Sequence, residues 1–164
     1  MTSKFWFAVV LSCASLLTSC SAQTMQLTLS LNEAELATGK VVLEAEVENE
    51  SLESIELLLW NTPLEAMLLG DLYRVTVVSD GNESVLPYQG RMVKRAAPGP
   101  NDYIVLKPGE SLRRTQSLAE AYSFCANRVY RLEFTGVFVS RDNEVIPARM
   151  NELKFTTGPN FPQC

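Results

Sequence analysis

The sequence predicts an all-β fold built from about eight to ten short strands. Apolar and polar residues alternate in several segments, which is the period of a strand with one buried face. Turn residues separate these segments at a spacing of roughly 10 residues. The length of 164 residues suits one domain with one core. Together these observations predict an immunoglobulin-like antiparallel β-sandwich over residues 25–164.

Strict alternation predicts the first three strands. Every second residue from Met25 to Leu31 is apolar, so segment 25–31 has one buried face. Segment 41–48 places apolar residues on one face and mainly acids on the other. Segment 54–60 alternates in the same way but ends in Trp60, which indicates that this end is also covered. Strands of this kind are typical of antiparallel sheets with one solvated face.

Turn residues predict how the later strands are connected. Asp80-Gly81 is typical of a β-hairpin turn. Lys107-Pro108-Gly109-Glu110 has Pro followed by Gly, which suits a type II turn. The strands predicted around and after these turns are 72–78, 84–88, 103–106, 112–118, 128–135, 137–140 and 153–156. Only segment 117–124 has locally helical character.

The composition excludes several classes of function. With 14 basic and 19 acidic residues the net charge is -5, which argues against nucleic acid as a partner. The chain has no histidine, which excludes His-ligated zinc and Ser-His or Cys-His catalysis. The acids from Glu44 to Glu53 are spread along a strand rather than gathered around one cation. We expect no enzyme, no cofactor and no metal site; a carboxylate-based activity is the enzymatic alternative, and no pair of acids is singled out for it.

Residues 1–20 are expected to direct export. Lys4 precedes an uncharged run over residues 5–17, which is too short to span a membrane and suits a secretory signal. The run ends in Leu17-Thr18-Ser19-Cys20, which resembles the lipobox of bacterial lipoproteins and implies a signal peptide over 1–19 with lipid on Cys20. Ordinary cleavage after Ala22 is the alternative. In the resemblance to lipoproteins, Ser21 after the cysteine implies that the protein is located at the outer membrane of a Gram-negative bacterium, where it faces the periplasm or the cell surface. Residues 20–24 are then expected to form a tether between the lipid and the domain.

Two further cysteines, Cys125 and Cys164, follow in the exported part of the chain. An oxidising compartment favours a disulfide between them. Closing a loop of about 40 residues stabilises a fold by about 4 kcal/mol on the chain-entropy account. The alternative is a pair of buried free thiols.

Four segments carry a more specific resemblance. They are LWNTPLE at 59–65, PYQGRMVKRAAP at 87–98, DYIVLKPGES at 102–111 and LAEAY at 118–122. In this order they resemble the N-terminal β-sandwich pro-domain of secreted bacterial aspzincin metallopeptidases, the deuterolysin-like, peptidyl-Lys enzymes. The resemblance covers about residues 25–157. Those proteases continue into a catalytic domain with an HExxH helix, whereas this sequence ends at Cys164 without any histidine.

The resemblance implies a binding function without proteolytic activity. We expect a lipid-anchored envelope protein that binds a secreted metallopeptidase and inhibits it by occluding its cleft. The alternative is a structural or adhesive envelope lipoprotein with no protease target. A metal-binding or catalytic role for this chain is not implied.

The expected protease contacts are Lys94, Arg95, Trp60 and Leu64. Lys94 and Arg95 precede a Pro/Gly-rich loop. The resemblance to peptidyl-Lys enzymes implies Lys94 as an uncleaved mimic of a substrate lysine; a solvated basic pair is the alternative. Trp60 and Leu64 can anchor a partner, since Trp is favoured at interface hot spots. Alternatively, Trp60 closes the end of the sandwich.

Overall fold

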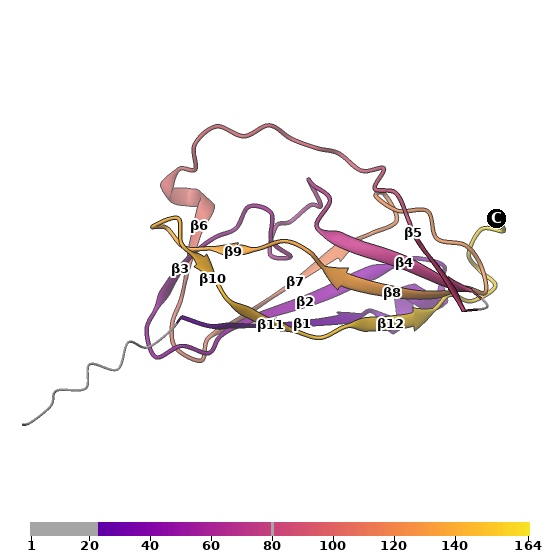
Figure 1. Ribbon diagram of the computed structural model, residues 1–164, viewed down its shortest axis with the longest axis horizontal. Helices are drawn as coiled ribbons and strands as arrows, with labels where there is room; N and C mark the ends of the chain where they lie inside the picture. Colours follow the sequence, from indigo (N-terminus) through magenta and orange to yellow (C-terminus); the bar gives the residue numbers. More distant parts are fainter. Residues whose placement is uncertain (1–22, 80) are drawn as a thin grey trace, which may run out of the picture.

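Two four-stranded sheets form the body of the protein (Figure 1). The computed structural model describes residues 23–164 except residue 80, so the predicted signal peptide and Cys20 lie outside the described residues. The first sheet has the order β11-β1-β2-β7 and the second the order β12-β8-β4-β5. Their strands are β1 (Met25–Leu31), β2 (Val42–Asn49), β4 (Tyr73–Ser79), β5 (Asn82–Val85), β7 (Ser111–Ser117), β8 (Val129–Phe134), β11 (Ala148–Met150) and β12 (Leu153–Thr156).

The core lies between the two sheets and confirms the predicted alternation. In β1 the side chains of Met25, Leu27 and Leu29 are buried, and the residues between them are more exposed. In β8 the same alternation buries Tyr130 and Leu132. Each sheet therefore contributes one apolar face, and burial of these faces is the main stabilising term of the fold.

Two small antiparallel sheets extend one end of the sandwich (Figure 1). They pair β3 (Ile55–Leu58) with β6 (Tyr103–Leu106) and β9 (Phe138–Val139) with β10 (Val145–Ile146). The predicted type II turn after β6 is confirmed. Glu110 N donates to the carbonyl of Lys107 at 2.9 Å, and Gly109 has the positive φ of 70° that this turn requires.

The structure departs from the predicted pattern in three places. Strands β10 and β11 were not predicted, and β11 pairs with β1 in parallel, so the pairing is not antiparallel throughout. A short helix, α1 (Glu33–Ala37), follows β1, and its N-cap Asn32 accepts a hydrogen bond from Glu35 N. The predicted helical segment 117–124 is a single turn closed by bonds from Ala121 N and Tyr122 N to the carbonyl of Leu118. Within the described part of the chain, no helix is long and apolar enough to cross a membrane.

One long connection lies outside the sheets. Residues 86–99, here named the strap, join β5 to the 3-10 helix η1 (Pro100–Asp102) without forming any strand or helix. In Figure 1 this segment runs over the top of the molecule before the chain enters β6. The loop between β3 and β4, residues 59–72, also lacks regular structure. These two irregular segments contain most of the residues that the sequence singled out.

Candidate functional site

The strap is fixed to the sandwich at its beginning by Tyr88 and Gln89. Gln89 N donates to the carbonyl of Ala121 at 2.8 Å. The ring of Tyr88 meets that of Tyr122 edge to face, with centroids 5.7 Å apart. The Tyr88 hydroxyl donates to the carbonyl of Arg91 at 2.7 Å, which closes a tight loop. A Cβ at Gly90 would lie 2.5 Å from the Tyr88 hydroxyl oxygen, so any other residue at position 90 would displace the Tyr88 ring.

The pKa values of both tyrosines are raised. Burial is the main cause for Tyr88, and the negative charge of Asp71 adds to it. For Tyr122 burial again acts first, followed by the hydrogen bond from its hydroxyl to Asp71 at 2.9 Å. Both hydroxyls therefore keep their protons at neutral pH. Tyr88 can donate to the Arg91 carbonyl under all physiological conditions.

The strap is fixed at its far end by four residues, here named the Arg95 cluster: Trp60, Glu65, Arg95 and Asp102. The Arg95 guanidinium lies 4.9 Å from the centre of the Trp60 ring, a cation–π geometry. Its Nη2 donates to Glu65 Oε1 at 2.6 Å. Trp60 Nε1 donates to Asp102 Oδ1 at 2.9 Å, and Asp102 Oδ2 accepts from Gly99 N at 2.7 Å. The cluster thus joins the β3–β4 loop to the end of the strap.

Between the two anchors, four consecutive residues are exposed: Arg91, Met92, Val93 and Lys94. Met92 is 78% and Val93 45% exposed, which is unusual for apolar side chains. Arg95 faces the sandwich and Lys94 is exposed, and no described residue forms an ion pair with Lys94. The structure therefore distinguishes the two basic residues, which the sequence could not.

The other predicted contacts occupy supporting positions. Leu64 is only 3% exposed and packs in the core beneath the groove beside the Arg95 cluster. Trp60 is half-buried, with Arg95 over its ring. Sequence reasoning missed Glu65 and Asp102, although both stand in the segments that carry the resemblance. The sequence gives no signal for these contacts, because Glu65 binds Arg95 and Asp102 binds Trp60, and in each case the two residues are far apart in the chain.

A groove of about 430 Å³ lies beside the Arg95 cluster. Its lining includes Trp60, Met67, Arg95, Asp102 and Arg114. A second hollow of about 460 Å³ lies beside the first strap anchor and shares Met67 with the groove. Met67 of the β3–β4 loop is 51% exposed and lines this second hollow together with Gly90 and Arg91 of the strap.

The charge of the strap is opposite to that of the whole protein. Residues 86–101 contain Arg91, Lys94 and Arg95 and no acid, whereas the chain carries a net charge of -5. Because Arg95 is paired with Glu65, Arg91 and Lys94 supply the exposed positive charge of this segment. The strap thus presents a pair of apolar side chains with one cation on each side. This combination is suited to a partner whose surface has an acidic pocket bordered by apolar residues.

The acidic row on β2 is arranged differently. Glu44 accepts from Asn32 Nδ2 at 3.0 Å. Glu46 accepts from Arg113 at 2.6 Å and from the Ser111 hydroxyl at 3.0 Å. The hydrogen bond from Arg113 is the main reason that the pKa of Glu46 is lowered. These carboxylates are each engaged along the sheet, and they do not converge on one point.

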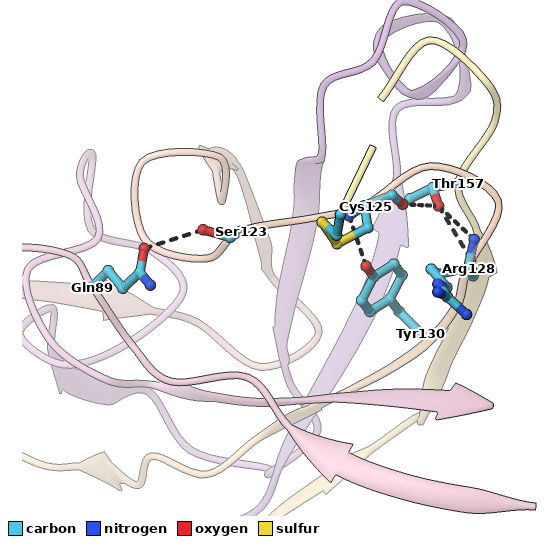
Figure 2. The surroundings of a disulfide bond; sticks show 7 residues. Gln89, Ser123, Cys125, Arg128, Tyr130 and Thr157 are labelled. Carbon is cyan, nitrogen blue, oxygen red and sulfur yellow. Dashed lines mark hydrogen bonds between the residues drawn. A yellow bond between two sulfur atoms is a disulfide. The ribbon is translucent and has the colours of Figure 1, made fainter. Parts of the chain in front are cut away.

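The disulfide predicted between Cys125 and Cys164 is present, with Cα atoms 5.6 Å apart (Figure 2). It ties the C-terminus to the segment before β8. Cys125 N donates to the Tyr130 hydroxyl at 2.8 Å, and the Thr157 hydroxyl donates to the Cys125 carbonyl at 2.5 Å. Two residues earlier, the Ser123 hydroxyl donates to Gln89 Oε1 at 3.1 Å. The disulfide region is thereby connected to the first anchor of the strap.

Comparison with known proteins gives a distant link to proteases. No protein-family model matches the chain. Over 119 residues the chain is 27% identical to a protein named extracellular protease from Aeromonas hydrophila. The match covers 73% of this chain and 33% of that protein, so the chain spans about a third of its relative. The fold is a β-sandwich with an anchored, exposed strap, and the similarity is compatible with a protease-associated domain.

Proposed function

We propose that this chain is an exported binding protein that inhibits an aspzincin-type metallopeptidase by placing the strap across its cleft. The observation that carries the proposal is the exposed stretch of Arg91 to Lys94 held between two anchors. The similarity to an extracellular protease supports the choice of partner class. In this proposal the chain is not an enzyme, and Cys20 carries the lipid that keeps it at the outer membrane.

Inhibition follows from shape and charge. The anchors order the strap before binding, so less conformational entropy is lost when it enters a cleft. Lys94 enters the acidic pocket of a Lys-selective enzyme, where its ammonium is paired. Met92 and Val93 cover apolar surface at the rim of that pocket. The bulk of the sandwich behind the strap then excludes substrate.

The test is inhibition of a purified peptidyl-Lys aspzincin metallopeptidase by residues 21–164, which include every described residue. We expect inhibition at micromolar concentration or below, and at least tenfold weaker inhibition by Lys94→Ala, about 1.4 kcal/mol. The matched control is Lys107→Ala, which removes an exposed lysine from the β6–β7 turn and should leave inhibition unchanged.

Each other result has a definite meaning. Equal inhibition by the wild type and Lys94→Ala would keep the function and discard Lys94 as a contact. Absence of inhibition by a folded sample would reject this protease class as the partner. A structural or adhesive envelope lipoprotein, which should bind cell-surface polymer, would then be the better account.

A further inference from the structure

The ion pair between Glu65 and Arg95 differs from the other ion pairs of the described residues. The Glu65 side chain is 9% exposed and that of Arg95 21%. In each of the other pairs one partner is at least 49% exposed. Exposed pairs contribute little because water screens them, whereas loss of one partner from a shielded pair leaves an uncompensated charge. Among the described residues, the ion pair that is most shielded from water therefore lies at the end of the strap.

Glu65 is itself held by two further parts of the protein. Its second carboxylate oxygen, Oε2, accepts from Asn61 N at 2.8 Å. Its backbone carbonyl accepts from Gln116 Nε2 at 3.0 Å, which ties it to β7 in the first sheet. Asn61 has a φ of 57°, a left-handed conformation that Asn tolerates better than most residues. Glu65 is thus a fixed acceptor rather than a flexible surface acid.

The fixed position of Arg95 also restricts the position of Lys94. Its guanidinium is held between the Trp60 ring and Glu65, so the backbone of residue 95 has a defined position and direction. Lys94 is the residue immediately before it, and its side chain is exposed, whereas Arg95 is partly buried. Without this contact, the strap would be free between Gly90 and Gly99, and every residue between them would have to be ordered on binding.

We infer that the Glu65–Arg95 pair is a positioning element that holds Lys94 in the conformation in which the strap binds. This inference rests on the proposed function. It makes Arg95 and Glu65 necessary for tight inhibition without either residue touching the protease. On this inference Arg95 does not itself contact the protease; it holds Lys94 in position for binding.

The first experiment is a double-mutant cycle on the inhibition constant. Glu65→Gln keeps the shape of the side chain and removes its charge, and we expect about tenfold weaker inhibition. In a Lys94→Ala background the same change should weaken inhibition less than threefold, because the lysine it positions is gone. A purely structural role would weaken inhibition by the same factor in both backgrounds. Equal factors would therefore overturn the inference.

The second experiment does not involve the metallopeptidase. Trypsin cleaves after Lys and Arg, and a strap held at both ends resists the local opening that cleavage requires. We expect Glu65→Gln to raise the cleavage rate after Lys94 at least tenfold, measured by mass spectrometry, with cleavage after the exposed Lys40 unchanged. An unchanged rate after Lys94 would show that the pair does not hold the strap. If the wild type fails to inhibit while this rate rises, the proposed function fails and the role of the pair in holding the strap survives.

Trp60→Phe covers the case in which Glu65→Gln does not fold. It keeps an aromatic ring beneath Arg95 and removes the hydrogen bond to Asp102. We expect a smaller loss of inhibition that again depends on Lys94, and faster cleavage after Lys94. A folded Trp60→Phe protein with wild-type values in both assays would overturn the inference.

Discussion

Removal of the disulfide tests how this fold is stabilised. The bridge joins residues separated by 39 positions. On the chain-entropy account, a loop of this length removes about 13 cal/mol/K from the unfolded chain, or about 4 kcal/mol at 25 °C. The double variant Cys125→Ser, Cys164→Ser should therefore lose about 4 kcal/mol of unfolding free energy. This corresponds to a fall of roughly 10–15 °C in Tm for a domain of this size.

The loss of unfolding free energy is expected to come from the unfolded state, which gains conformational freedom without the bridge. In the folded state, other contacts hold Cys125 in place. Its backbone N–H is bonded to the Tyr130 hydroxyl and its carbonyl to the Thr157 hydroxyl, and neither bond needs the bridge (Figure 2). Cys164 is exposed at the terminus, so serine is tolerated there. The native circular dichroism spectrum should therefore stay unchanged. The denaturant m-value should rise, since the unfolded chain expands without its cross-link.

The measurement is urea unfolding of the oxidised wild type and the variants, followed by fluorescence. The single variant Cys164→Ser serves as a control and should lose nearly as much as the double variant, because either change removes the bridge. A loss below about 1 kcal/mol, together with an unchanged m-value, would refute the entropic account given above. A changed native spectrum would instead show that the bridge maintains the folded structure.

Two further predictions concern pH and backbone conformation. Burial raises the pKa of both Tyr73 and Tyr122, so the folded state keeps protons that the unfolded state releases near pH 10. The free energy of unfolding should thus be unaffected below pH 10 and should fall above pH 10 by up to about 1.4 kcal/mol per pH unit for each tyrosine. Urea unfolding from pH 8 to 11 would measure this fall. A free energy of unfolding that stays constant over this range would contradict the prediction. Gly39→Ala should destabilise more than Gly109→Ala, because both have positive φ but a Cβ at Gly39 would also lie 2.6 Å from the carbonyl oxygen of Asn160. We expect about 1 kcal/mol for Gly109→Ala and at least twice that for Gly39→Ala in thermal unfolding, and equal losses would contradict the clash.

The strands were accessible to sequence reasoning because their signal is local. Every one of the ten predicted segments overlaps a strand, and the bounds of β1, β6 and β12 agree to the residue, whereas β5 shares only residues 84–85 with its predicted segment. Helix α1 was missed although its signal is present, since Asn32 is followed by Glu35 three residues later, a pattern typical of helix N-termini. Segment 117–124 was predicted to be locally helical, but its apolar side chains fill the core and support the strap.

The candidate site was accessible only in part. Lys94 and Trp60 stand out in the sequence as a basic residue beside a loop and an aromatic residue at a strand end. The contacts that connect them to Arg95 and Glu65 cannot be predicted from the sequence, because the strap has no periodic pattern from which the direction of its side chains follows. The contact that orients Arg95 comes from residues 30 and 35 positions earlier.

The sequence by itself determined where most of the strands lie, which face of the strictly alternating strands is buried and where the type II turn falls. Each of these depends on the polarity and backbone preferences of neighbouring residues, which are local properties. Only the tertiary structure decided that β11 lies parallel to β1, that Leu64 is buried, and that Arg95 faces inward while Lys94 is exposed. These depend on contacts between segments far apart in the chain, and such contacts exist only once the two sheets have packed.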